Sequence, residues 1–103
     1  MKISISGYSL LGLGVDFKDY VEQRMHLDVE RRVSDPSHAK VVLLKYNHLF
    51  SVAIIIGEGV GRDFLEFRGD SNASDIYHAF DLALSHLSEQ ISEDKERISE
   101  RKA

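Results

Sequence analysis

The chain has 103 residues, 43% of them hydrophobic, which suits one folded domain of ordinary size. It contains no cysteine, which excludes disulfides, thiolate metal sites and cysteine nucleophiles. Its 13 basic and 17 acidic residues give a formal net charge of −4, which argues against a generally basic nucleic-acid-binding protein but leaves room for a local basic surface.

The first third of the chain predicts a strand followed by an amphipathic helix. Ile3 and Ile5 alternate with polar residues over 2–6, which is the pattern of a half-buried strand. Asp16 is a suitable N-cap for a helix that ends before Pro36, because a proline disfavours helical backbone at the residue that precedes it. The apolar stripe of this helix steps by four residues and consists of Phe17, Val21, Met25, Val29 and Val33.

Three further strands are predicted in the middle of the chain. Val and Leu dominate 40–46, and aliphatic residues dominate 50–56, so both segments have high strand propensity. The glycine-rich segment Gly57–Gly61 is typical of a turn, and it leads into another predicted strand at 62–68.

A long helix is predicted at the end of the chain, because no Gly or Pro interrupts residues 71–103. Asn72 or Ser74 is the expected N-cap, and we expect the helix to fray beyond about residue 95, where its apolar stripe thins. The stripe consists of Ile76, Phe80, Ala83, Leu87, Ile91 and Ile98.

The element order β-α-β-β-β-α predicts an α+β fold in one domain that covers residues 1–103. Three consecutive strands most simply form an antiparallel meander, and the first strand joins it at an edge. The result is a mixed four-stranded sheet with two helices packed on one face, similar to double-stranded-RNA-binding domains.

No residue pattern supports an enzyme or a metal site. The five histidines lack the spacing of helical zinc sites, and no nucleophile elbow of the Gly-x-Ser-x-Gly type is present. A strand rather than a helix follows Gly57–Gly61, which excludes a dinucleotide fingerprint there. We expect no catalytic residue, metal ion, cofactor or small-molecule substrate, and apolar runs of about five residues are too short to span a membrane. The remaining functional interpretation is that Arg and Lys side chains form a binding surface. The alternative is an ordinary solvated surface of mixed charge.

Four segments of the chain form a distinctive set. The most specific is Asp75-Ile76-Tyr77-His78-Ala79-Phe80-Asp81, followed by Leu87 and Gln90, and the others are the opening strand with Gly7, the helix segment Asp16–Arg24 and the strand segment Val41–Lys45. In these segments, and over nearly its whole length, the chain resembles the ribosome hibernation-promoting factor family, which includes the ribosome-associated translation inhibitor and the sigma-factor modulation proteins.

This resemblance implies a non-catalytic inhibitor of translation in the bacterial cytoplasm. Family members bind the small ribosomal subunit in the channel for messenger and transfer RNA, and they stabilise idle ribosomes under stress. The chain ends at Ala103 and so lacks the C-terminal dimerisation domain of long-form members, which implies a short-form monomer or weak dimer. The resemblance further implies that ribosomal RNA is contacted by Lys18, Arg24, Lys45, Lys95 and Arg97.

The long helix departs from the family pattern, since His86, Glu89 and Glu93 stand where similar proteins carry Lys or Arg. A carboxylate at a phosphate contact replaces attraction by repulsion. The alternative function is therefore a protein-interaction module of the same fold, in which the acidic helix binds a basic partner and RNA affinity is weakened or lost.

Overall fold

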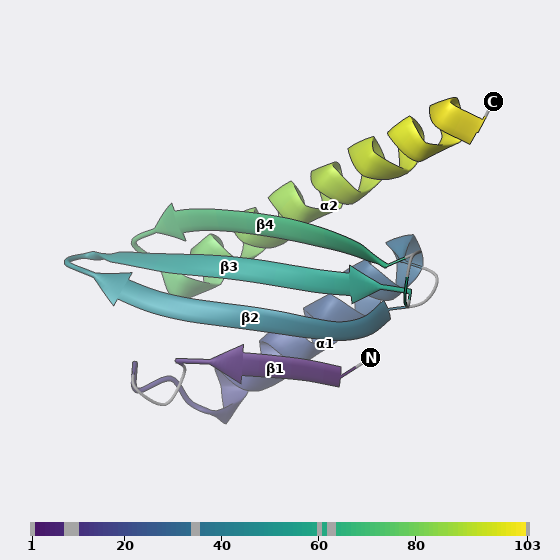
Figure 1. Cartoon of the computed structure of the whole chain (residues 1–103). Coiled ribbons are helices and arrows are strands. Elements are labelled where there is room, and N and C mark those ends of the chain that lie inside the picture. The colour runs from purple at the N-terminus through teal and green to yellow at the C-terminus, as the bar shows by residue number, and fades with distance from the viewer. Residues whose placement is uncertain (1, 8–10, 34–35, 60, 62–63, 103) are drawn as a thin grey trace.

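The structure, a computed structural model, describes residues 2–7, 11–33, 36–59, 61 and 64–102, with side chains described as far as Lys95. Within these residues it contains a four-stranded sheet and two helices, and both helices lie on the same side of the sheet (Figure 1). In chain order the elements are β1 (Lys2–Ser6), α1 (Val15–Arg32), β2 (Pro36–Tyr46), β3 (Leu49–Glu58), β4 (Leu65–Ala73) and α2 (Ile76–Lys102).

The strands lie side by side in the order β1-β2-β3-β4. β1 runs parallel to β2, and the crossover between them contains α1, whereas the other neighbours are antiparallel. β2 and β3 form a hairpin through a two-residue turn, in which Asn47 takes a positive φ of 57°. The predicted element order, the mixed sheet and the placement of both helices on one face are confirmed.

Alternation along the strands separates a covered face of the sheet from an open face. Val41 and Leu43 of β2 are buried beneath the helices, whereas their neighbours Val42 and Leu44 point to the open side. The predicted apolar stripes of the helices are buried as well, from Phe17 to Val33 and from Ile76 to Ile91. Ile98, the last member of the second stripe, lies outside the described side chains. The core therefore lies between the helices and the covered face.

The last strand lies further along the chain than its predicted span of 62–68. β4 begins at Leu65 and stays paired with β3 until Ala73 meets Phe50. Gly69, which follows the end of the predicted strand, is a buried strand residue on the covered face. A Cβ atom on it would lie 2.3 Å from the carbonyl oxygen of Ala83 and 2.7 Å from the Cα of Leu87. The backbone of α2 thus rests directly on β4 at a position that only glycine fits.

Both predicted helix caps are wrong. α1 begins at Val15 with Gly14 as the N-cap and no side-chain capping bond, so Asp16 lies within the first turn, where its charge still favours the positive helix end. In front of α2, the carboxylate of Asp75 accepts a hydrogen bond of 2.9 Å from the backbone N–H of Tyr77. Because β4 extends to Ala73, Asn72 is a strand residue, and its amide oxygen accepts a hydrogen bond from Ser51 instead.

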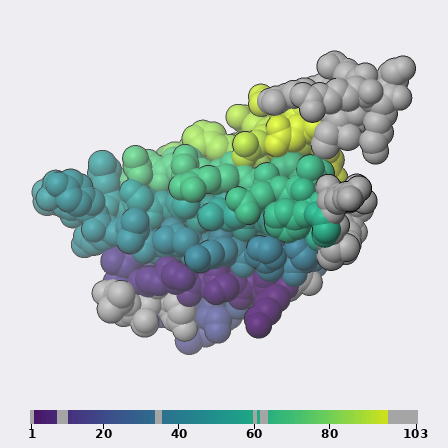
Figure 2. Space-filling view, viewed as in Figure 1, coloured from purple at the N-terminus to yellow at the C-terminus, as the bar shows by residue number. Residues whose placement is uncertain are grey.

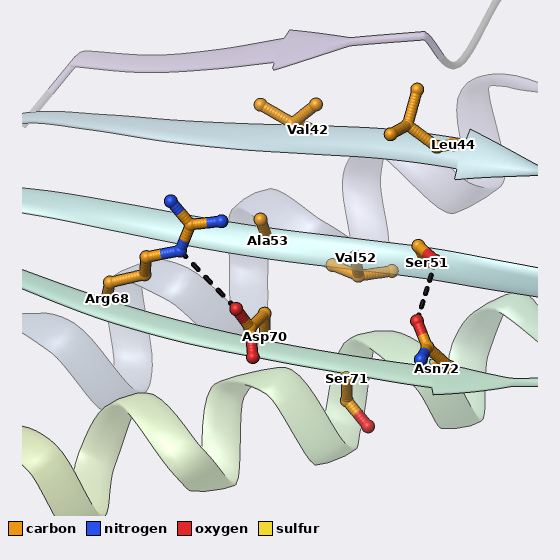
Figure 3. Close-up of a pocket in the computed structure, with 9 residues that line it drawn as sticks. All are labelled: Val42, Leu44, Ser51, Val52, Ala53, Arg68, Asp70, Ser71 and Asn72. Carbon is orange, nitrogen blue, oxygen red and sulfur yellow. Dashed lines mark hydrogen bonds and ion pairs between the residues drawn. The ribbon is translucent and has the colours of Figure 1, made fainter.

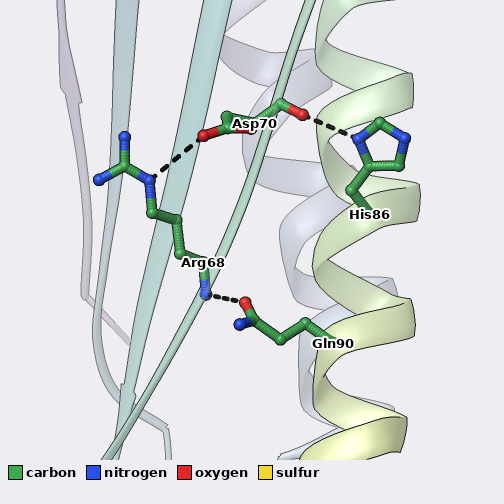
Figure 4. A network of polar contacts seen from close by, with 4 residues as sticks. All are labelled: Arg68, Asp70, His86 and Gln90. Carbon is green, nitrogen blue, oxygen red and sulfur yellow. Dashed lines mark hydrogen bonds and ion pairs between the residues drawn. The ribbon is translucent and has the colours of Figure 1, made fainter.

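Side chains of α2 also protect the outer edge of β4 (Figure 4). The side-chain oxygen of Gln90 accepts a hydrogen bond of 2.7 Å from the backbone N–H of Arg68. One turn earlier, Nδ1 of His86 donates to the backbone carbonyl of Asp70 at 2.8 Å. Edge strands expose unpaired backbone groups that invite aggregation, and these two contacts occupy such groups. The family-like spacing of Gln90 therefore has a structural explanation.

Candidate functional site

Four aromatic rings and one carboxylate join the two helices near their N-terminal ends. The hydroxyl of Tyr20 donates a hydrogen bond of 2.6 Å to Oδ1 of Asp81. The rings pack edge to face, with centroids 5.0 Å apart for Tyr20 and Tyr77 and 5.3 Å for Phe17 and Tyr77. We call Phe17, Tyr20, Tyr77, Phe80 and Asp81 the helix clasp. Three of its members come from the segment that most resembles the hibernation factors.

The environment of the helix clasp changes the acidity of Tyr20. Burial raises the pKa of its phenol above the usual 10.0, and the hydrogen bond to Asp81 raises it further. The neutral phenol is therefore the form that this site stabilises. The clasp is a structural contact that fixes the angle between the helices, and nothing in its chemistry requires a ligand.

Arg24 and Arg31 lie on the flank of α1 that faces α2, with Arg24 beside the helix clasp and Arg31 about two helical turns further towards the C-terminal end. At about 100° per residue, Arg24 follows Tyr20 by roughly 40° around the helix, and Arg31 lies within roughly 20° of Arg24. Both arginines are exposed. The guanidinium carbon of Arg24 lies 5.9 Å from the centroid of the Tyr20 ring, a cation–π contact that holds this side chain against the clasp. We call Arg24 and Arg31 the arginine pair.

Lys95, one of the predicted RNA contacts, links α2 to the C-terminal ends of α1 and β3. Its Nζ donates a hydrogen bond of 2.6 Å to the backbone carbonyl of Arg32 at the C-terminal end of α1. The same Nζ lies 3.3 Å from Oε2 of Glu58, whose side chain is only 14% exposed. Lys95 thus neutralises a half-buried carboxylate and a helix C-terminus, which leaves it poorly placed as a free cation.

The other predicted cations do not join the arginine pair in one cluster. Lys18 lies in the first turn of α1, about 120° around the helix from Arg24. Lys45 lies at the end of β2 on the covered side, with its Nζ 5.3 Å from the centroid of the Phe50 ring. The side chain of Arg97 lies outside the described residues. RNA contacts by these residues stay predictions.

The acidic residues that depart from the family pattern lie on another side of α2. Glu89 and Glu93 are both exposed, and they are roughly 120–160° around the helix from Lys95. Glu93 lies within roughly 20° of His86, which contacts β4, whereas Glu89 lies roughly 60° from His86, on the solvent side of α2. The spacing of four residues predicts that both glutamates share one helix face. It does not predict which neighbour that face meets, because this depends on how α2 packs.

The open face of the sheet contains a shallow depression of about 340 Å³ (Figure 3). Ala53 leaves room at its centre, and Val42 and Leu44 form its apolar side. Four of its polar residues are paired with one another, Arg68 with Asp70 at 3.4 Å and Ser51 with Asn72 at 2.6 Å. Ser71 also lines the depression.

Other kinds of site find little support in the described part of the chain. No group of three or more His, Cys, Asp or Glu residues there could hold a metal ion. Among the described residues, no helix is both long and apolar enough to cross a membrane.

Comparisons with known proteins agree with the fold. A ribosomal subunit interface protein from Coxiella burnetii has a similar solved structure, with a TM-score of 0.65 and 17% sequence identity over 92% of this chain and 98% of that one. None of the curated proteins matches the sequence significantly. The sequence profile of the family described as sigma 54 modulation protein / S30EA ribosomal protein matches residues 4–99, which is almost the entire chain. The chain therefore belongs to the sigma 54 modulation protein / S30EA ribosomal protein family.

Proposed function

We propose that this protein is a cytoplasmic, non-catalytic inhibitor of translation that binds ribosomal RNA of the small subunit in the channel for messenger and transfer RNA under stress. Membership of the family supports association with the ribosome. The finer statement rests on the residues of this chain, and it needs neither a cofactor nor a small-molecule substrate.

The observation that carries the proposal is the arginine pair. Both side chains are exposed on one flank of α1, seven residues apart, which is about 10 Å along the helix axis. A guanidinium contacts phosphate with two parallel hydrogen bonds, and two of them at this spacing can contact phosphates of one RNA segment. The cation–π contact with Tyr20 restrains Arg24 before binding, which lowers the entropic cost of the contact.

The acidic residues of α2 weaken the proposal less than the sequence suggested. Glu89 and Glu93 lie roughly 120–160° around α2 from Lys95, which contacts the end of α1, so an RNA segment on the arginine pair would not meet them directly. At physiological salt the Debye length is about 8 Å, which screens much of the remaining repulsion between exposed charges. A chain of net charge −4 can therefore still present a local site for phosphate.

Sedimentation with purified small subunits over a salt series tests the proposal. We expect binding that weakens with salt. Arg24→Ala with Arg31→Ala should reduce affinity and flatten the salt dependence by about one unit of log–log slope for each phosphate that the variant no longer neutralises. Lys2→Ala with Arg68→Ala is the matched control, because it removes two cations from the strands while leaving α1 intact. Equal weakening in both variants would indicate a general charge effect, and no binding by the wild type would overturn the proposal.

A protein-interaction module is the second candidate, and the exposed pair Glu89 and Glu93 favours it. If the partner is a basic protein, the salt dependence of binding should come from these glutamates. The variant Arg24→Ala with Arg31→Ala should then bind with unchanged affinity. Digestion of ribosomal RNA before sedimentation separates the two functions, since only the module would still bind the remaining ribosomal proteins.

A further inference from the structure

The β2–β3 hairpin extends beyond the rest of the sheet at one end. The last residue of β1 pairs with Val42, and the last pair of β4 joins Ala73 to Phe50. Beyond these pairs, β2 and β3 continue to the pair of Tyr46 with Leu49 around the turn. We call residues 45–50 the hairpin tip. Phe50 at its base is still paired with β4, and the residues around the turn extend beyond both neighbouring strands at the left edge of the molecule in Figures 1 and 2.

Acidic residues are absent from nearly the whole β2–β3 hairpin, although the chain as a whole is acidic. The sequence has 17 acidic residues, but none of them lies between Pro36 and Gly57. The same segment carries two lysines and two histidines, which are Lys40, Lys45, His38 and His48. A protruding element without carboxylates is complementary to a phosphate backbone.

The two sides of the hairpin tip present different chemical groups. Tyr46 points to the open side, and at 77% exposure it is the most exposed of the large hydrophobic residues in the described part of the chain. Lys45 points to the opposite side, where its ammonium group lies over the ring of Phe50. A strand alternates its side chains in this way, so one tip offers an aromatic face on one side and a cation on the other.

A stable protein interface is a poor match for this surface. The exposed apolar residues at this end of the open face are Leu44, Tyr46 and Leu49, at 61%, 77% and 47% exposure. Taking roughly 200 Å² for a fully exposed side chain of this size, they offer about 350–400 Å², against the roughly 800 Å² per partner of a stable complex. Stacking on a nucleobase needs only one ring, and it is tolerant of sequence.

We propose that the hairpin tip is a second RNA contact, in which Tyr46 stacks on an unpaired nucleobase while Lys45 contacts a phosphate. The inference rests on the proposed function, since the RNA is ribosomal. It adds a site that is separate from the arginine pair, in the sheet rather than on α1. The tip inserts between RNA segments, because its two contacts point in opposite directions.

A tryptophan probe tests the stacking directly. The chain contains no Trp, so Tyr46→Trp introduces a single indole at the tip. Addition of purified small subunits should quench its emission, because a stacked nucleobase quenches indole fluorescence. Phe64→Trp is the matched control, since Phe64 is an exposed aromatic residue at the far end of the sheet, near His38. A blue shift of the Tyr46→Trp emission without quenching would indicate burial against a protein and would overturn the nucleobase contact.

Affinity measurements separate this inference from the proposed function. Tyr46→Ser should weaken small-subunit binding about tenfold, which matches the contribution of one base stacked on an aromatic ring, and Tyr46→Phe should bind like the wild type. Phe64→Ser should bind like the wild type as well. If wild type and Tyr46→Ser bind equally well, the tip proposal is wrong and the ribosome proposal stands. If the wild type does not bind small subunits at all, both are wrong.

Discussion

The helix clasp and the hairpin tip both carry tyrosines, but the two regions place these rings in opposite surroundings. Tyr20 and Tyr77 pack against other rings and, through Tyr20, against the carboxylate of Asp81. Tyr46 projects from the sheet with most of its surface exposed. The clasp contains the segment that most resembles the hibernation factors, and yet its side chains mainly contact one another. A recognisable sequence segment can therefore mark a packing requirement, while the free binding groups lie elsewhere.

The largest expected effect is a difference in the free energy of unfolding between a substitution in the clasp and one near the tip. Phe80 is fully buried, so Phe80→Ala should reduce the free energy of unfolding by about 3–5 kcal/mol in urea titrations. Leu44→Ala, on the open face near the tip, should change it by less than about 0.5–1 kcal/mol. Equal reductions in the two variants would contradict the division between a covered and an open face.

Because α2 packs closely on β4, we expect the second largest loss of stability from a substitution at Gly69. Gly69→Ala places a methyl group against backbone atoms of Ala83 and Leu87 that cannot move independently. We expect a decrease of about 1–3 kcal/mol in the free energy of unfolding, the usual cost of overpacking. Gly14→Ala adds the same methyl where no atom lies within 4 Å, and it should cost less. A neutral Gly69→Ala would mean that α2 lies further from the strand.

Removal of the phenol hydroxyl in the helix clasp should have a smaller, pH-dependent effect. Tyr20→Phe removes the hydrogen bond to Asp81 and should cost about 1–2 kcal/mol at neutral pH. Because the pKa of Tyr20 is raised in the folded state, this stabilisation is present below pH 10 and is lost as the pH rises through the folded-state pKa. Urea titrations from pH 8 upwards should show the wild type losing its advantage over the variant. Tyr46→Phe should cost less than about 0.5 kcal/mol at neutral pH, because its side chain is exposed.

The fold could be predicted from sequence because it depends on periodicity. Steps of four from Phe17 and the alternation of Ile3 and Ile5 with polar residues each identify a buried or half-buried face without any knowledge of neighbouring elements. The boundaries of β4 could not be predicted from sequence, because a glycine within a strand is explained here only by the backbone of α2 above it. The predicted strand therefore stopped before Gly69.

The candidate site was only partly predictable, because it depends on which flank of a helix faces which neighbour. Sequence identified Arg24 by position, but it gave no sign that Lys95 would pair with Glu58 and the end of α1, across long stretches of sequence. It also gave no sign that Tyr20 reaches Asp81. Contacts of this kind arise from the packing angle of the helices, which no local pattern encodes.

The smallest expected effect concerns the two glutamates of α2. Glu89→Lys with Glu93→Lys should leave the melting temperature almost unchanged, because both side chains are exposed. Since they lie away from the arginine pair and the hairpin tip, we expect small-subunit affinity at physiological salt to rise by less than about threefold, and only a long-range increase at low salt. A rise of about tenfold or more in sedimentation at physiological salt would place RNA on this flank of α2 and replace the arginine pair as the main contact. Loss of binding would instead favour a basic protein partner that contacts the two glutamates.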